Sequence, residues 1–263
     1  MDLIEEIARL FGFDRFESHL PDPIAPGVLS PKQKIERYLR ENLCSAGLQE
    51  ITTFSLVGKN ENDKYMVPIK NPLLSETSNL RTSLFEEHLN VCTRNMNSGQ
   101  RGCWIFEMGN IYKKIDKTIK EELILGGVIS GERRLEKWTT SGKVSNLDYY
   151  EARGKLTQVF MRLNIEITDD VMTSNNGLLH PGKSVDLILE AKRFGKFGQL
   201  HPEKADIYNL PPQTYVFEIL LKPILEAASR SKKWNITYKS FNTNPYLERD
   251  IAMILSKEIT TAE

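Results

Sequence analysis

Three stretches of the chain place apolar residues at the spacing of one helix face. In the first, residues 2–11, the apolar positions are Leu3, Ile4, Ile7, Leu10 and Phe11. A second helix is predicted from Ser30-Pro31, where an N-capping serine precedes a proline suited to the first turn, to about Ser45. A third is predicted from Leu84 to Met96, and Gly99 suits the left-handed position that ends such a helix.

Continuous apolar runs predict buried strands between and after these helices. The predicted strands cover residues 50–57, 103–109, 123–130, 185–190, 196–200 and 215–221. A further helix is predicted at 149–163 and a short one after His201-Pro202-Glu203, while three prolines between residues 13 and 29 indicate an extended linker. The pattern therefore predicts a mixed fold of helices and strands.

Length and charge narrow the class of protein. A chain of 263 residues can bury a large core, so we expect one main domain with appended pieces. Lys and Arg together number 35, as do Asp and Glu, and this balance argues against a protein that coats nucleic acid, although it leaves room for a local basic patch. No apolar run reaches the ~20 residues of a membrane span, so no membrane association is predicted.

The cysteines and the chain ends add two expectations. Three widely spaced cysteines in apolar surroundings, Cys44, Cys92 and Cys103, indicate reduced core residues of a cytoplasmic protein rather than disulfide or zinc ligands. The first helix begins directly after Met1, and residues 259–263 look like the start of another helix. We therefore expect a fragment of a longer protein.

The strongest candidate site is a group of three carboxylates at the start of the chain. Asp2, Glu5 and Glu6 share one face of a helical turn. Oxygen ligands of this kind suit Mg²⁺, which commonly takes one or two carboxylates and keeps several waters. The alternative is that the acids favour the helix N-terminus through the macrodipole, and from the residues alone both interpretations stay open.

Two other groups of polar residues have weaker support. His180 and His201 each precede a proline, and structural turns are a better interpretation than a metal or acid–base pair because no acid or cysteine accompanies them at ligand spacing. A basic cluster could contact phosphates, although a solvated linker is the simpler interpretation. Its members are Arg230, Lys232, Lys233 and Lys239.

The sequence of residues 71–112 is a more specific indicator of a protein family than any of these patterns. NPLLSETSNLRTSLFEEHLNVCTRNMNSGQRGCWIFEMGNIY resembles the form NPLS…LRTSLLPGLL…RN…G…LFEIGRVF of the bacterial beta-subunit family of phenylalanine–tRNA ligase. LHPGKS, GKFGQLHPEKADIYNLP and YVFEILLKPIL are similar to the same family in the same order. The resemblance covers essentially the whole chain, as a fragment of the C-terminal half of the subunit.

The resemblance implies an α+β fold with three parts. Residues 1–20 would end a small helical, DNA-binding-like domain. Residues 21–230 would form a class II aminoacyl-tRNA synthetase-like antiparallel sheet with flanking helices, in a catalytically inert copy whose Ser30–Val57 unit forms an interface. Residues 231–263 would be a linker and the truncated first strand of a ferredoxin-like anticodon-binding domain, carried by SFNTNPYLERDIAMIL.

The resemblance also implies that no residue here is catalytic or binds a cofactor. Arg81 and the Gly109–Lys113 strand resemble the second class II signature, but Lys113–Thr118 does not follow the pattern of arginine, histidine and an acidic residue that catalytic relatives carry in the following loop. At the place of the third signature, Val216–Lys222 contains no arginine. Without those cations the charge that develops during phosphoryl chemistry is not offset, so we expect a domain that cannot form an adenylate.

The implied function belongs to an assembly. The chain would scaffold an alpha subunit that uses ATP and Mg²⁺ to attach phenylalanine to its tRNA, in a cytoplasmic heterotetramer of two alpha and two beta subunits. Asp2, Glu5 and Glu6 match a magnesium site shared with the alpha subunit and completed by an upstream Asp, so the site is incomplete in this chain. The alternative is a stand-alone scaffold or regulatory module derived from a synthetase domain.

Overall fold

The computed structural model describes residues 2–20, 27–132, 146–173, 177–230, 238, 240–256 and 259. The chain divides into two compact units, Met1–Lys233 and Trp234–Glu263. The described helices include none that is long and apolar enough to cross a membrane.

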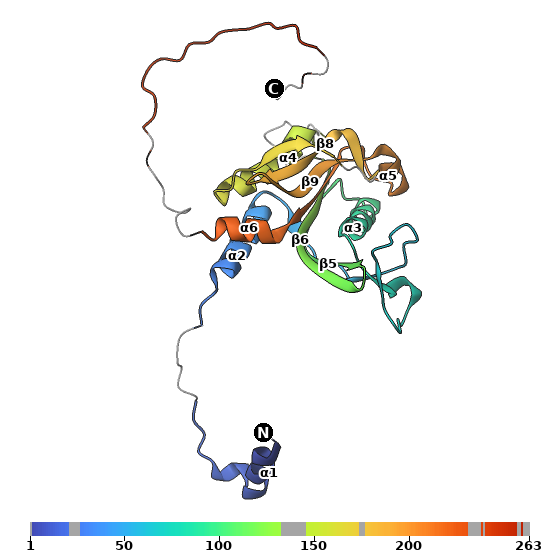
Figure 1. Cartoon of the computed structure of the whole chain (residues 1–263), viewed down its shortest axis with the longest axis vertical. Helices are drawn as coiled ribbons and strands as arrows, with labels where there is room; N and C mark the ends of the chain where they lie inside the picture. The colour runs from blue at the N-terminus through green and yellow to red at the C-terminus, as the bar shows by residue number, and fades with distance from the viewer. Residues whose placement is uncertain are drawn as a thin grey trace. The chain divides into compact units, whose positions relative to one another are not determined.

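A seven-stranded sheet forms the centre of the larger unit (Figure 1). In spatial order its strands are β1 (Gln49–Glu50), β5 (Gly102–Ile115), β6 (Thr118–Gly131), β10 (Thr214–Leu220), β9 (Lys192–Leu200), β8 (Leu179–Leu189) and β7 (Thr168–Val171). Every neighbouring pair is antiparallel except β1 and β5, which run parallel.

Helices cover both faces of this sheet, as the predicted α+β fold requires. One face packs against α2 (Pro31–Ser45), α4 (Tyr149–Arg162) and α6 (Leu221–Ala228), and the other against α3 (Phe85–Asn97) and α5 (Pro202–Ile207). Alternate residues of β5 serve the two faces, because successive strand side chains point in opposite directions. Trp104 and Phe106 join the first core, whereas Cys103 and Ile105 join the second.

The helix boundaries follow the capping residues of the sequence. Ser30 accepts a hydrogen bond from the Gln33 amide in a capping box, so α2 begins where the serine–proline pair predicts. Asp148 caps α4 in the same way. Gly99, with φ of 87°, follows the end of α3. The helix α6 was not among the predicted elements.

The strand predicted at residues 50–57 is wrong as a single element. Only β1 joins the large sheet, and β2 (Leu56–Val57) joins a separate three-stranded sheet with β4 (Asn79–Leu80) and β3 (Val67–Pro68). Between them the backbone leaves the ladder because the amide and hydroxyl of Thr53 both donate to the Glu107 carboxylate. A side-chain acceptor thus ends the strand, and η2 (Ser75–Thr77) lies beside β2.

The hairpin of β5 and β6 is longer than its neighbours. The two strands pair from Gly102 with Gly131 to Ile115 with Thr118, around a turn at Asp116-Lys117 in which Asp116 has φ of 52°. On β6, β10 pairs only with residues 124–130. The last turn of the hairpin is therefore a two-stranded ribbon without a third strand.

Two of the three cysteines match the prediction of reduced core residues. Cys92 and Cys103 are free and buried, and a hydrogen bond with Cys103 together with burial raises the pKa of the Cys92 thiol. Cys44 is free but exposed, so the core assignment is wrong for it. It lies on the outer side of α2, opposite the face that carries Leu39 and Leu43 into the core.

The chain ends add few contacts of their own. At the N-terminus, α1 (Asp2–Phe11) forms as predicted and η1 (Phe13–Arg15) follows it, with no buried residue in either. Part of the expected extended linker, residues 21–26, lies outside the described residues. The described residues of the second unit, within 240–256, form no helix or strand. The ferredoxin-like start and the predicted domain boundaries stay predictions.

Candidate functional site

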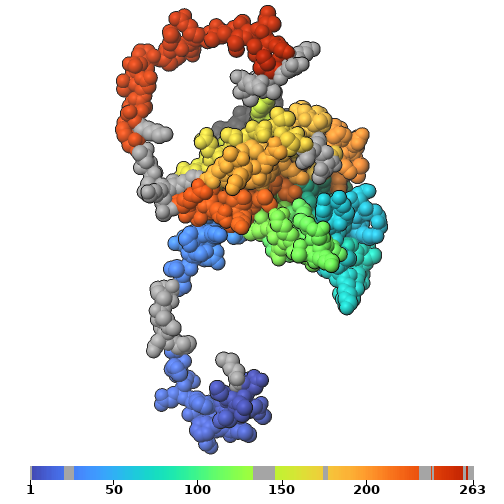
Figure 2. All heavy atoms as spheres, viewed as in Figure 1, coloured from blue at the N-terminus to red at the C-terminus, as the bar shows by residue number. Residues whose placement is uncertain are grey.

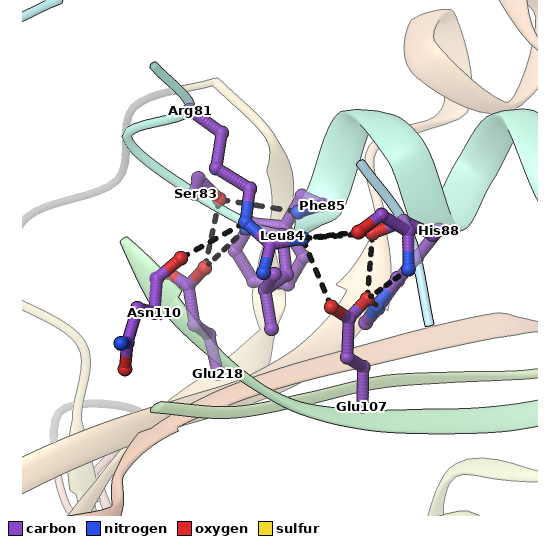
Figure 3. A network of polar contacts seen from close by, with 9 residues as sticks. Arg81, Ser83, Leu84, Phe85, His88, Glu107, Asn110 and Glu218 are labelled. Atoms are coloured by element: carbon purple, nitrogen blue, oxygen red, sulfur yellow. Dashed lines mark hydrogen bonds and ion pairs between the residues drawn. The ribbon is translucent and has the colours of Figure 1, made fainter. Parts of the chain in front are cut away.

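A cluster of polar side chains lies buried beside β5 and the start of α3 (Figure 3). Its centre is the ion pair of Arg81 and Glu107, whose Nη1 and Oε1 atoms lie 2.9 Å apart, with each side chain 4% exposed. His88 approaches the same carboxylate, with Nε2 3.2 Å from Oε2, and the Thr53 hydroxyl lies 2.6 Å from that oxygen. We call these four residues the Arg81–Glu107 network.

The guanidinium of Arg81 is held by the protein itself. Its Nε donates to the carbonyl of Asn110 at 2.9 Å, and its Nη1 donates to Oγ1 of Thr53 at 2.8 Å. A side chain at Gly109 would collide with the guanidinium, so the glycine lets β5 pass directly beside it. An external phosphate could reach this cation only by displacing Glu107 or by opening the core.

The Glu107 carboxylate stays ionised because its partners outweigh burial. Burial alone would raise its pKa, but hydrogen bonds from His88 and Thr53 and the charge of Arg81 lower the pKa of Glu107 to about 2. Because a carboxylate can only accept, Nε2 of His88 carries the shared proton. The other ring nitrogen, Nδ1, is buried and has no hydrogen-bond partner among the described residues.

A glycine across the hairpin allows α3 to approach the network. Gly126 pairs with Glu107 in the ladder. A Cβ atom at this position would lie 3.0 Å from Leu84 and 3.3 Å from Cε1 of His88. The missing side chain therefore makes room for the first turn of α3 and places His88 over the carboxylate.

A second carboxylate occupies the place of the third class II signature. Oε1 of Glu218 on β10 accepts from the Ser83 hydroxyl at 2.8 Å and from the Leu84 amide at 3.0 Å, as Figure 3 shows. These bonds satisfy donors at the start of α3, where Leu84 itself offers no side-chain cap. The Nζ of Lys196 lies 3.8 Å from the same carboxylate.

Together these residues form a network of ion pairs and hydrogen bonds in the core. Arg81 is paired with Glu107, and Glu218 adds a carboxylate within the segment 216–222. Phosphoryl transfer requires cations that face the transferred group. The arrangement instead fixes α3, β5, β10 and the segment before β2 to one another.

The predicted metal ligands lie on α1. Asp2 and Glu5 belong to its first turn, as predicted, whereas Glu6 forms an ion pair with Arg9 on the same helix. Within the described parts of the chain, no group of three or more His, Cys, Asp or Glu residues could hold a metal ion. The magnesium site of Asp2, Glu5 and Glu6 therefore stays a prediction.

The two histidines lie in different kinds of structure, and the turn predicted at His180 is wrong. His180 lies in β8, beside the register shift between Leu179 and Ser184, and its Nδ1 accepts from the Gly182 amide at 3.1 Å. His201 precedes α5 at its N-cap position, and its Nδ1 lies 3.9 Å from Glu203. These contacts agree with the structural interpretation of both residues.

The basic cluster near residue 230 is partly neutralised. The guanidinium of Arg230 donates to both oxygens of Glu190, at 2.5 and 3.0 Å. A paired arginine is a poor phosphate ligand unless the pair opens. Lys232, Lys233 and Lys239 lie outside the described residues.

The sequence analysis missed the partners of Arg81. Glu107 interrupts an apolar strand, and a charge inside a buried strand requires a counter-charge. That signal could have identified the carboxylate as the partner of a nearby cation. The contributions of His88, Thr53 and Glu218 depend on three-dimensional placement, and no local pattern marks them.

Comparison with known proteins agrees with this architecture. The phenylalanyl tRNA synthetase beta chain CLM domain family matches residues 17–221. The chain is 50% identical over 263 residues to the phenylalanine–tRNA ligase beta subunit of Prochlorococcus marinus (strain MIT 9313), covering 100% of this chain and 32% of the relative. It is 52% identical over 257 residues to the beta subunit of Parasynechococcus marenigrum (strain WH8102), covering 98% and 31%.

The chain thus spans about a third of the length of the curated relatives it matches. A solved structure of Desulfitobacterium hafniense PylSc, a pyrrolysyl tRNA synthetase, is similar with a TM-score of 0.53 and 13% identity. The similarity covers 74% of this chain and 65% of the other. At this identity the likeness is one of fold alone, and the fold is that of a synthetase.

Proposed function

This chain belongs to the phenylalanyl-tRNA synthetase beta chain family, and from that premise we propose that it is a non-catalytic scaffold within a beta subunit. The beta subunit would support an alpha subunit that uses ATP and Mg²⁺ to attach phenylalanine to its tRNA. Two alpha and two beta subunits would form the cytoplasmic enzyme. The activity belongs to that assembly, of which this chain is one part.

The observation that carries the proposal is the closed Arg81–Glu107 network. The signature arginine Arg81 is 4% exposed and ion-paired, and the segment 216–222, which the resemblance matches to the third signature, contains no arginine. The chain therefore keeps the synthetase fold, while the Arg81 side chain is buried and paired with Glu107 instead of facing a phosphate. Such a domain supports a catalytic partner without competing for its substrates.

The partner would contact the outer side of the α2 unit. Leu39 and Leu43 are fully buried in the chain's own core, so substitutions of these two residues would report on folding rather than on assembly. The exposed side of α2 carries Arg37, Tyr38 and Glu41. Mutations there would test an interface, whereas mutations of the leucines would unfold the domain.

Magnesium would bind at α1 only in the longer protein. Asp2 and Glu5 provide carboxylate oxygens, the ligand type that Mg²⁺ prefers, and Glu6 could join them by leaving Arg9. Mg²⁺ demands near-octahedral geometry and usually keeps several waters beside one or two carboxylates, so water and further chain would be needed to complete its shell. These residues fit a part of a metal shell, and the alpha subunit and upstream residues would complete it.

Phenylalanine-dependent ATP–pyrophosphate exchange tests the proposal directly. We expect none from the purified chain, and full exchange from the alpha subunit assembled with a full-length beta subunit that contains it. Exchange by the chain alone would contradict the scaffold assignment. To exclude contamination, the chain is prepared from cells whose own phenylalanine–tRNA ligase carries a tag, and that enzyme is removed on an affinity resin before the assay.

An assembly measurement separates the scaffold from a stand-alone module. Arg37→Asp with Tyr38→Ala should weaken co-elution with the alpha subunit while circular dichroism of the chain is unchanged. Lys192→Asp, at the exposed first residue of β9, serves as a control of similar charge change. If the double variant and the control co-elute equally well with the alpha subunit, the α2 surface is not the interface.

A further inference from the structure

The free end of the β5–β6 hairpin is basic, and its residues are exposed except for the half-buried Lys113. Residues 113–120 read Lys-Lys-Ile-Asp-Lys-Thr-Ile-Lys, with four lysines against one aspartate. Because β10 pairs with β6 only over residues 124–130, this end projects as a ribbon supported on neither side by a third strand of the large sheet. We call residues 113–120 the hairpin tip.

The lysines of the hairpin tip are mostly without counter-charges. Lys120 pairs with Glu122, at 2.7 Å. No ion pair involves Lys113, Lys114 or Lys117 in the part of the chain that the structure describes. In addition, Lys113 lies directly opposite Lys120 in the ladder, a like-charge pair that costs stability in the free protein.

An aromatic residue lies beside these lysines. The backbone amide of Lys114 donates to the carbonyl of Tyr65 at 2.8 Å, which ties the loop before β3 to the hairpin tip. Tyr65 is 44% exposed, and Nζ of Lys64 lies 5.2 Å from its ring centroid. In Figure 2 the green hairpin and the cyan segment that follows β2 lie side by side on the surface.

We propose that the hairpin tip and Tyr65 form an RNA-binding surface. Ammonium groups on a projecting ribbon can follow a phosphate backbone, and an exposed aromatic ring can stack on a base that is not paired. Phosphates would also offset the repulsion between Lys113 and Lys120. The inference rests on the proposed function only in naming tRNA as the RNA, since the charges and the ring would suit other single-stranded or looped RNA.

The surface is distinct from the Arg81–Glu107 network. That network buries its arginine, so it cannot contribute to binding RNA, and the net charge of the whole chain is zero. Binding would therefore depend on a local surface rather than on the overall charge. This locality allows a control that changes the same number of charges elsewhere.

The test is a fluorescence anisotropy titration of an unmodified phenylalanine tRNA transcript with the 263-residue chain at several salt concentrations. The variant Lys113→Gln, Lys114→Gln, Lys117→Gln should bind at least tenfold more weakly. Its log–log salt slope should be shallower by about 2, since each phosphate contact contributes about 0.7–0.9. The control Lys32→Gln, Lys192→Gln, Lys222→Gln removes the same charge from other exposed lysines and should bind like the native chain.

A second variant separates stacking from charge. Tyr65→Ala should weaken binding about tenfold with an unchanged salt slope, because a stacked base contributes ~1–3 kcal/mol irrespective of salt. Equal weakening by the tip variant and by the control would overturn the proposal. Unchanged RNA affinity in the tip variant would also overturn the proposal. If that variant instead lost binding to the alpha subunit, the hairpin tip would be a protein contact.

The same variants in the assembled enzyme keep the two proposals apart. If the proposed function holds, the tip variant in full-length beta should raise KM for tRNA and leave kcat unchanged. An assembly with native beta that fails to aminoacylate would count against the proposed function, while the titration of the chain alone still decides whether the tip binds RNA.

Discussion

The same two strands carry charge in two opposite ways. In the buried half of the β5–β6 hairpin, Glu107 is matched by Arg81 and His88, and each polar group is placed by a neighbouring element. At the free end, Lys113 lies opposite Lys120 in the ladder, and Lys120 is the one of these two that pairs with an acid, Glu122, among the described residues. The comparison shows that an arginine in a signature position is not evidence of a phosphate site, because availability depends on what surrounds the cation.

Removal of the buried acid should have the largest effect on stability. Glu107→Gln leaves the guanidinium of Arg81 buried without a counter-ion, and breaking such a pair costs roughly 3–5 kcal/mol. Urea unfolding followed by circular dichroism should show a loss of that size. The matched control Glu121→Gln, on the exposed part of β6, should stay within about 0.5 kcal/mol. Similar losses in both variants would mean that burial does not distinguish the two regions.

Removing both partners sharpens the comparison. Arg81→Met and Glu107→Leu should each destabilise the chain, and the double variant should lose less than the sum of the two by about 1–3 kcal/mol. The double variant still leaves His88 and Thr53 without their acceptor, so we do not expect native stability. A double-mutant cycle measured by urea unfolding gives the coupling, and a value near zero would contradict a direct interaction of Arg81 with Glu107.

Acid should weaken the buried region specifically. The folded-state pKa of Glu107 is about 2, below the usual glutamate value of ~4.3. The ionised carboxylate therefore contributes fully to the free energy of unfolding above pH ~4.3, and this contribution is lost as the pH falls toward 2. The loss should be on the order of 2–3 kcal/mol, at about 1.4 kcal/mol per pKa unit. Unfolding measured between pH 6 and pH 3 should be less pH-dependent in Glu107→Gln. Identical pH profiles of stability for the native chain and Glu107→Gln would show that Glu107 does not cause the loss of stability in acid.

The exposed end should respond weakly and in the other direction. Lys113→Glu replaces repulsion across the ladder by attraction to Lys120, so stability should rise by about 0.2–1 kcal/mol. Lys117→Glu, at the turn, should change it by less than about 0.5 kcal/mol. A loss above 1 kcal/mol in either variant, measured by thermal unfolding, would show that the lysines support the fold.

The sequence predicted local structure better than the site. Ser30-Pro31 and Gly99 determine helix ends through local bonds, so those boundaries are confirmed. The strand at 50–57 fails because Thr53 turns to a carboxylate 54 residues away, which no local window contains. The helix at 221–228 follows β10 without a break, and its apolar residues extend the strand pattern.

The residues of the candidate site are far apart in the sequence, so local patterns predicted the site less well than the helix ends. The resemblance marked Arg81 as a signature residue, and the absence of arginine at 113–118 and 216–222 predicted an inert domain. Which acid would neutralise the arginine could not be read from spacing, because Glu107 and Arg81 come from different elements and meet only in the folded core. The comparisons confirm the family and leave the metal ligands at Asp2, Glu5 and Glu6 as a prediction.

The bonds from Ser83 and Leu84 to Glu218 also set an order of events during synthesis. The acceptor lies 135 and 134 residues further along the chain than the donors. At a translation rate of about 5–20 residues per second, roughly 7–27 seconds pass before the ribosome adds it. Until then the first turn of α3 has no Glu218 to accept its bonds, so the nascent chain must wait, with this side of the sheet unfinished, for its last strand.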